Sequence, residues 1–422
     1  MELARLLSPR RPRQRNEPEE SRSEYARDHD RLLFSDSFRR LGRKTQVHPL
    51  NENDHIHTRL SHSLETASVG RSLGRKAGRK IDLPDGVTPE DVGEIVQAAC
   101  LAHDIGNPPF GHAGEEAVRA FFRERGQHFL EKLSEDERAD LLRFEGNAQG
   151  FRVVTRLELN LDRGGMRLTY PVLGALLKYP WTAASPLAEA GKCSALHADR
   201  HTLDEVASEL GLPSREDHPG YHRHPLAWLV EAADDLCYSL LDLEDARELG
   251  LVRFGEIAEV LEPLAETTGR GEDSERRRLS LMRTRCIHGA VEEMTSRFAD
   301  LLPDMLEGRM EGSLLKQCGD PVRSAITGAK DLAKQHIYYH RRKLELEIGS
   351  HAVLGKLLTA FCTACLEQAD GSPSLRSQHL IRILGEHAPA PGDTHHHALL
   401  KALDYISGMT DHYARQLAER IG

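Results

Sequence analysis

The sequence predicts an all-α protein, and three observations support this prediction. From about Ser23 onward, apolar residues recur at helical spacing, while the alternation typical of strands is scarce. The chain has 422 residues, 39% of them hydrophobic, which suffices for a large buried core. No stretch approaches the ~18 consecutive apolar residues of a membrane span, and arginine and proline follow the first seven residues too soon for a secretion signal. We therefore expect a helical protein of the cytoplasm that does not contact a membrane.

Charge and cysteine usage argue against two further classes. The net charge of −10 disfavours nonspecific nucleic-acid binding over the whole surface, because such binding requires cations that neutralise phosphates. Seven scattered cysteines, an odd number, do not form a disulfide framework. Cys362 and Cys365 form a CxxC with no second pair nearby, so we interpret them as helix-packing residues rather than metal or redox ligands.

The pattern divides the chain into three segments. Residues 1–22 carry six arginines among Pro, Glu and Ser, with no large apolar residue after Leu7, so we expect a disordered tail. Residues 23–250 are predicted to form the helical core, in which the Pro-, His- and Gly-rich stretch 180–224 is an irregular insertion. Residues 251–422 are predicted to form a helical region that packs on this core and completes its site.

The clearest helix start is at Thr88, an N-cap followed by Pro89 and two acidic residues. This helix should run to about Asp104, and Gly106 should supply the left-handed residue that ends it. A small hairpin is expected at residues 164–165. Further helices are expected near residues 24–44, 59–80, 114–125, 147–159, 170–179, 225–248, 254–267, 275–307, 323–347, 350–368, 374–387 and 396–420.

The helix expected at 225–248 is amphipathic in an unusual way. Its apolar side should face the core, and the opposite side carries an acidic stripe that contains one aromatic residue: Glu231, Asp234, Asp235, Tyr238, Asp242 and Asp245. A solvated helix face usually interleaves lysine or arginine, but no basic residue follows here until Arg247. Because clustered carboxylates repel one another, the stripe favours a bound cation over a plain solvated face.

A second signal is His103-Asp104, which stands at a helix end before a tight loop. Adjacent side chains at such a position can converge on one ion, whereas in mid-helix they diverge. His62, in the first turns of another expected helix, could face the same ion. A set of two imidazoles and two carboxylates suits a divalent metal and leaves positions open for water and phosphate oxygens, which is typical of hydrolysis.

These residues resemble the HD-domain deoxyguanosinetriphosphate triphosphohydrolase family over roughly residues 23–420. The resemblance implies an HD-domain helical bundle with additional C-terminal helices. It is carried by these motifs: Arg39-Arg40-Leu41, Lys44-Thr45-Gln46, Arg59-Leu60-Ser61-His62-Ser63, His103-Asp104-Ile105-Gly106-Asn107-Pro108-Pro109-Phe110-Gly111-His112, Leu177-Lys178-Tyr179-Pro180-Trp181, Glu231-Ala232-Ala233-Asp234-Asp235 and Asp404-Tyr405-Ile406-Ser407-Gly408. Residues 182–220, including Lys192, depart from the family pattern, so the preferred nucleobase stays open.

The resemblance also implies site residues. The metal ligands would be His62, His103, Asp104 and Asp234, with Asp235 as the alternative fourth ligand. The catalytic pair would be His112 and Glu115, whose i, i+3 spacing would let the carboxylate orient the imidazole. The substrate-binding residues would be Gln46, Tyr238 and Asp242 at the sugar, with Arg59, Lys178 and Tyr338 near the phosphates and sugar.

The expected reaction is metal-dependent hydrolysis of a deoxynucleoside triphosphate to the deoxynucleoside and tripolyphosphate, with Mg²⁺, Mn²⁺ or a similar divalent ion. The family resemblance favours a homo-oligomer and leaves single-stranded nucleic acid or a nucleotide effector open as further partners. Two alternatives remain at this stage. One is another HD hydrolase, a 5′-nucleotidase or a phosphodiesterase, and the other is a nucleotide- or DNA-binding regulator with low turnover.

Overall fold

The computed structural model describes residues 1–13, 22–46, 56–158, 164–338 and 341–421. In these ranges the chain is helical, with three isolated β-bridges and no sheet, which confirms the all-α prediction. The first helices are α1 (Leu3–Leu6), α2 (Glu24–Leu33), α3 (Asp36–Arg40), α4 (Arg59–Gly78), α5 (Pro89–Ala102), α6 (Gly111–Glu124), α7 (Glu135–Leu142), α8 (Gly146–Arg152), α9 (Tyr170–Leu176), α10 (Arg200–Leu210) and α11 (Pro225–Glu248). The remaining helices are α12 (Phe254–Ala265), α13 (Glu275–Leu306), α14 (Val322–Ala333), α15 (Arg341–Ala369), α16 (Leu375–Leu384), α17 (His395–Ser407) and α18 (Asp411–Arg420).

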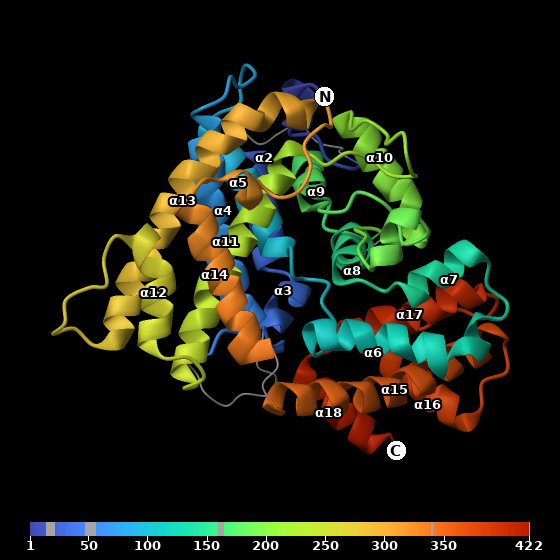
Figure 1. Cartoon of the computed structure of the whole chain (residues 1–422). Helices are drawn as coiled ribbons and strands as arrows, with labels where there is room; N and C mark the ends of the chain where they lie inside the picture. Colours follow the sequence, from blue (N-terminus) through green and yellow to red (C-terminus); the bar gives the residue numbers. More distant parts are fainter. Residues whose placement is uncertain (14–21, 47–55, 159–163, 339–340, 422) are drawn as a thin grey trace.

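The helices form two groups around two hydrophobic clusters (Figure 1). In the first group α4 packs along α5, α11 and α13, and α9 packs on α5 and α11. In the second group α15 packs against α6, α16, α17 and α18. The segment after residue 250 therefore contributes to both clusters, and the predicted division at that residue stays a prediction.

Helix α15 contains the stretch Glu347–Ala369, which is long and apolar enough to cross a membrane by length and composition. Half of this stretch is buried inside the protein, where Leu354, Leu358 and Phe361 are fully covered. These contacts are those of a core helix in the second group of helices.

Local sequence explains the two helices that carry most of the site. Helix α5 begins with Thr88 as N-cap, whose side chain accepts from the Asp91 amide, and it ends with His103 as C-cap. Helix α11 buries Leu229, Ala233 and Leu236 completely, as its predicted apolar side requires.

The loop after His103-Asp104 differs from the prediction at Gly106. Its φ is not among the positive values, which fall instead on Phe110 (66°) and Gly111 (57°). Gly106 is needed because the backbone of α8 approaches so closely that a Cβ at this position would lie 2.0 Å from the Gly150 nitrogen. Buried Lys44 fixes the same loop, since its Nζ donates to the carbonyl oxygens of Asn107 (2.6 Å) and Ser407 (2.7 Å).

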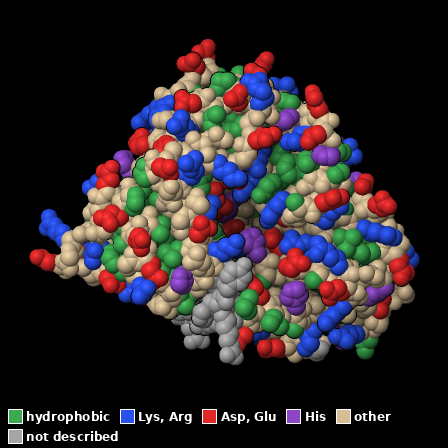
Figure 2. Space-filling view, viewed as in Figure 1, with side chains coloured by type: hydrophobic (Ala, Val, Ile, Leu, Met, Phe, Trp, Pro, Cys, Tyr) green, Lys and Arg blue, Asp and Glu red, His purple; other side chains and the backbone are tan. Residues whose placement is uncertain are grey.

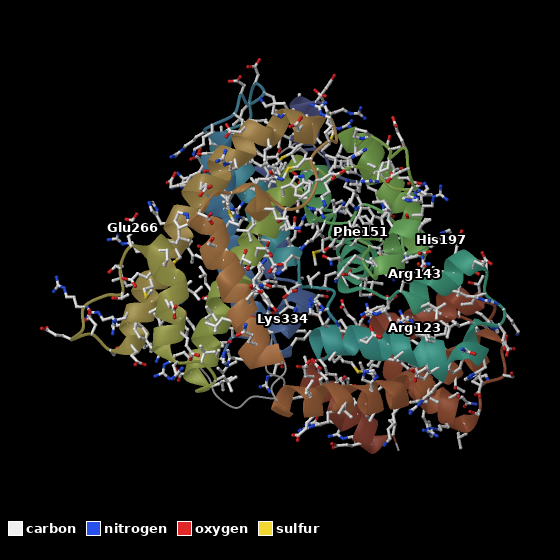
Figure 3. All side chains as sticks on the ribbon, in the orientation of Figure 1. Arg123, Arg143, Phe151, His197, Glu266 and Lys334 are labelled. Carbon is white, nitrogen blue, oxygen red and sulfur yellow. The ribbon has the colours of Figure 1, made fainter. Side chains whose placement is uncertain are left out.

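Two helices in and before the irregular segment expected at 180–224 were not predicted. Helix α10 lies within this segment, and α7 lies before it and outside every predicted helix. Arg143 at the end of α7 donates to the carbonyl oxygens of Ala183 and Ser185, and the backbone of His197 donates to Asp140, so the insertion is anchored on α7 (Figure 3). The expected hairpin is not seen in the described residues: Gly164 and Gly165 adopt left-handed φ, and residues 159–163 lie outside the described ranges.

The prediction of a disordered tail is wrong for residues 1–13. Leu6 and Leu7 are buried in the first hydrophobic cluster, and Arg11 is buried in an ion-pair network. Its guanidinium contacts Glu24 Oε2 at 2.5 Å and Asp28 Oδ1 at 2.9 Å. Composition gave no sign of this because the partners of Arg11 come from α2.

Replacing Arg11 with methionine is expected to lower the free energy of unfolding by about 3 kcal/mol, because it leaves two buried carboxylates without their cation. Denaturant unfolding of the purified variant measures this. The matched control is Arg22→Met, which removes an exposed pair with Asp30 and should change stability by less than about 1 kcal/mol. Equal effects of the two changes would show that the first segment is not docked in solution.

Candidate metal centre and active site

A cavity of about 390 Å³ opens where the two groups of helices meet. Figure 2 shows the hollow near the centre of this face, with blue Lys and Arg side chains around its mouth. Its walls come from α4, the loop between α5 and α6, α9, the insertion and α11. Its polar lining includes Gln46, Arg59, His103, Asp104, Asn107, His112, Asn147, Lys178, Lys192, Glu231, Asp234, Asp235, Tyr238 and Glu347.

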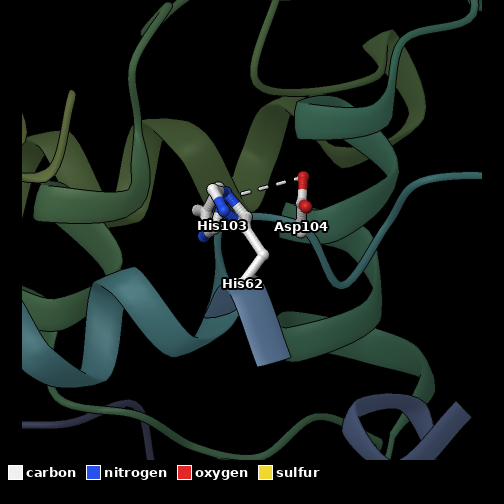
Figure 4. Close-up of side chains that lie close together, drawn as sticks. All are labelled: His62, His103 and Asp104. Carbon is white, nitrogen blue, oxygen red and sulfur yellow. Dashed lines mark ion pairs between the residues drawn. The ribbon is translucent and has the colours of Figure 1, made fainter. Parts of the chain in front are cut away.

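Four predicted metal ligands come together at one side of this cavity. His62 on α4, His103 at the end of α5 and adjacent Asp104 offer donor atoms that all lie within 4.8 Å of one another (Figure 4). Asp234 on α11 adds a carboxylate oxygen 3.1 Å from His62 Nε2 and 3.5 Å from His103 Nε2. Three helices therefore converge on a cluster of two imidazoles and two carboxylates.

The donor set fits a single divalent ion. Two donors that each lie about 2.1 Å from one ion, at octahedral or tetrahedral angles, are roughly 3.0–3.4 Å apart. The separations of Asp234 from the two imidazoles match this spacing. His103 Nδ1 donates to the carbonyl oxygen of Cys100 at 2.6 Å, so Nδ1 carries a proton and Nε2 is the ring nitrogen directed at the cluster. That Nε2 is buried without a hydrogen-bond partner, as expected of a metal-ligating atom.

The charged groups of the cluster shift one another's pKa values. Burial lowers the pKa of His103, but the carboxylates of Asp104 and Asp234 raise it to about 9. Burial raises the pKa of Asp104, but the Arg59 guanidinium and the two histidines hold it at about 2. Asp104 is also oriented by hydrogen bonds, since its Oδ1 accepts from Asn107 (2.6 Å) and its Oδ2 from Arg59 (2.7 Å). This carboxylate is therefore ionised and fixed for cation binding.

The structure distinguishes Asp234 from its neighbour. Asp235, the alternative fourth ligand, pairs with Lys330 of α14 at 2.8 Å, whereas Asp234 faces both imidazoles. The prediction that the acidic stripe lacks basic partners is also wrong for Glu231 and Asp245. Glu231 pairs with Lys178 (3.3 Å) and Arg223 (2.9 Å), and Asp245 pairs with His57 (2.7 Å). These partners come from other elements, so the helix sequence alone did not reveal them.

The predicted catalytic pair is assembled at the start of α6. This helix begins at Gly111, three residues earlier than predicted, so His112 lies in its first turn. The His112 side chain is 81% exposed, and its Nδ1 lies 2.9 Å from Glu115 Oε2. Glu115 is buried, and its other oxygen accepts from the Gly146 amide at 2.7 Å. Burial raises the pKa of Glu115, but the hydrogen bond to His112 and the charges of His112 and Lys192 hold it below its ordinary value.

Four of the six predicted substrate-binding residues line the cavity: Gln46, Arg59, Lys178 and Tyr238. Gln46 Oε1 is buried without a hydrogen-bond partner, so a donor from a ligand would satisfy it. Asp242 is buried at 3% exposure and is not among the described residues of the cavity wall, so its contact with the sugar stays a prediction. The side chain of Tyr338 lies outside the described residues.

Three polar residues of the cavity had no predicted role: Asn107, Asn147 and Lys192. Asn107 orients Asp104, and Asn147 and Lys192 lie on the side of His112 and Glu115. Asn107 stands inside the HD motif and Asn147 at the start of a predicted helix, but neither had a signal of its own. Lys192 lies in the insertion, where the family pattern did not apply.

The HD-domain family model matches residues 59–170, and the model of the phosphohydrolase-associated domain matches residues 317–420. Together with the His/Asp cluster, these matches define an HD-domain phosphohydrolase, a metal-dependent class. A protein of Pseudomonas aeruginosa named "Deoxyguanosinetriphosphate triphosphohydrolase-like protein" is 44% identical over 95% of this chain and 93% of its own length. The chain therefore belongs to the deoxyguanosinetriphosphate triphosphohydrolase-like family.

Two other relatives cover nearly the whole chain. A protein of the same name from Synechocystis is 38% identical over 100% of this chain and 99% of its own length. The Klebsiella pneumoniae protein named "Deoxyguanosinetriphosphate triphosphohydrolase" is 28% identical over 92% of this chain and 91% of its own length.

Proposed function

We propose that this phosphohydrolase cleaves deoxynucleoside triphosphates to the deoxynucleoside and tripolyphosphate. The observation that carries the proposal is the joint placement of the metal cluster, exposed His112 and two lysines, Lys178 and Lys192, in one cavity. A triphosphate needs several cations, and a leaving 5′-oxygen needs a proton donor. The printed name of the Klebsiella relative supports the same substrate class.

Each group in the cavity has a separate task in this reaction. A divalent ion held by His62, His103, Asp104 and Asp234 would polarise a phosphoryl oxygen and activate water. Lys178, whose pKa is lowered by burial but raised above its ordinary value by Glu231, is charged and attracts phosphate oxygens. His112 lies at the surface of the cavity, where Glu115 holds its Nδ1 and leaves Nε2 free to protonate the departing 5′-oxygen.

Gln46 and Tyr238 are assigned to the sugar. The unpartnered Gln46 Oε1 can accept from a deoxyribose 3′-hydroxyl, and the Tyr238 ring offers a flat apolar surface to the sugar. Asp242 is left out of this assignment because it is not among the described residues of the cavity wall.

Incubating the pure protein with each of the four dNTPs and several divalent metals, followed by chromatography of all products, tests the proposal. We expect deoxynucleoside and tripolyphosphate in equal amounts. Orthophosphate released from nucleoside monophosphates alone would indicate a 5′-nucleotidase, and cleavage of diesters alone a phosphodiesterase. Binding without turnover would favour the regulatory alternative. A homo-oligomeric assembly belongs to the same proposal, and sedimentation of the pure protein tests it.

Tyr238 should also contribute to discrimination against ribonucleotides. If its ring packs on C2′ of the sugar, a 2′-hydroxyl would be crowded and left without a partner, so ribonucleotides should be poor substrates. Tyr238→Ala should reduce the ratio of kcat/KM for dNTP over NTP by about 10-fold or more, corresponding to one lost packing contact. Tyr238→Phe is the matched control and should keep the ratio. Unchanged discrimination in the alanine variant would remove Tyr238 from this role.

A further inference from the structure

Glu145 is a fully buried carboxylate near His112 and Glu115, and it has no task in the proposed reaction. It is the N-cap of α8, where Oε2 accepts from the Asn147 amide at 2.5 Å and Oε1 from Asn147 Nδ2 at 2.8 Å. The next residue, Gly146, donates its amide to Glu115. Glu145 is therefore linked to Glu115, which contacts His112, through the backbone amide of the adjacent residue Gly146.

The two buried carboxylates act on each other. Burial raises the pKa of Glu145, and the charge of Glu115 raises it further, while Lys192 lowers it. Two adjacent buried acids stay ionised together only if cations accompany them. In the described residues the groups placed to supply this charge are His112, which contacts Glu115, and Lys192, whose Nζ lies 3.0 Å from Glu145 Oε1.

Lys192 is the movable member of this group. Its side chain is 39% exposed and lines the cavity, whereas that of Glu145 is inaccessible. Lys192 reaches Glu145 through one ion pair, and Glu145 keeps both hydrogen bonds from Asn147 if that pair opens. An anionic ligand in the cavity can therefore compete for Lys192 without leaving Glu145 unsatisfied.

We infer that Lys192 and Glu145 form a relay that couples phosphate binding in the cavity to protonation of His112. When a polyphosphate draws Lys192 away, Glu115 and Glu145 together face a single cation, the His112 imidazolium. The added negative charge favours the protonated imidazole, which takes its proton from water because it is exposed. The inference rests on the proposed general-acid role of His112 and makes Glu145 a positioning residue for it.

Other charged groups lie near Lys192, Glu145 and His112. Arg59 of α4 and Glu347 of α15 also line the cavity. Asp140 of α7 is engaged by His396 of α17 and by the backbone amides of residues 197 and 198. These contacts of Asp140 involve neither Lys192 nor Glu145.

The test is an NMR titration of His112 in the Mg²⁺-loaded protein, with ¹³C-labelled histidine and the resonance assigned through His112→Gln. Each protein is titrated without and with saturating tripolyphosphate. In the wild type, tripolyphosphate should move the titration midpoint of His112 upward by about one pH unit. In Lys192→Met the midpoint should already be higher without tripolyphosphate, and in Glu145→Gln it should be lower. In both variants the increment caused by tripolyphosphate should fall to less than half.

Lys316→Met is the matched control and should behave as wild type, because Lys316 is exposed and is not among the described residues that line the cavity. Increments equal to wild type in Lys192→Met and Glu145→Gln would overturn the relay. If Glu145→Gln fails to fold, as judged by circular dichroism and metal content, Lys192→Met alone decides. The titration does not depend on turnover, so a failed relay is distinguishable from a wrong substrate, which only product analysis reveals.

Discussion

Asp234→Asn is expected to empty the metal centre and abolish hydrolysis, while Asp235→Asn keeps its metal. The two residues are adjacent on α11, but Asp234 lies 3.1 Å from His62 Nε2 and Asp235 is paired with Lys330. An amide in place of the Asp234 carboxylate removes a negative charge and a ligand atom. Changing a residue that only hydrogen-bonds to a metal ligand lowers metal affinity by up to about 100-fold. Loss of the ligand itself should therefore lower the affinity by more than this.

Elemental analysis of the purified variants measures bound metal directly, and hydrolysis is followed by product chromatography. His103→Gln and Asp104→Asn should behave like Asp234→Asn, because each removes a donor of the same cluster. Metal retained with wild-type affinity in all three variants would mean that the ligand assignment is wrong. Loss of metal in Asp235→Asn but not in Asp234→Asn would identify Asp235 as the fourth ligand.

The sequence predicted those parts of the site that depend on local structure. Helix α5 was located from its N-cap and proline, and this placed His103 and Asp104 at a helix end. The period of α11 placed Asp234 opposite the buried leucines. The catalytic pair required only i, i+3 spacing, although α6 begins earlier than its loop suggested. Local rules and the resemblance together therefore predicted residues that the structure brings together.

The remainder depends on packing between distant segments. Lys330, Lys178 and His57 neutralise stripe carboxylates from elements that periodicity cannot position. Gly106 was assigned a left-handed turn because glycine commonly ends helices, but its actual constraint is the backbone of α8. Burial of Arg11 similarly required knowledge of α2. Such residues become interpretable only once their neighbours are known.

His112→Ala is expected to lower kcat by about 10²–10⁴-fold with metal content and fold unchanged, because general acid catalysis contributes a factor of this size. The imidazole is 81% exposed and contacts Glu115, so its removal leaves no cavity in the core. Glu115→Gln should cause a smaller loss, since the imidazole remains but loses its charged partner. Circular dichroism and elemental analysis of both variants exclude unfolding and metal loss.

A substrate whose leaving group needs no proton separates proton transfer from other roles of His112. A dNTP analogue with sulfur in place of the bridging 5′-oxygen breaks the corresponding bond and releases a weakly basic thiolate, so His112→Ala should hydrolyse it at a rate close to that of the wild type. Equal impairment with this analogue and with the natural substrate would contradict the general-acid role and favour phosphate binding by the imidazole. Loss of metal in His112→Ala would instead make the residue a ligand. Because Glu115 holds Nδ1, the proton should leave from Nε2, and His112→Gln, which can donate a hydrogen bond but not transfer a proton, should be nearly as slow as His112→Ala on the natural substrate.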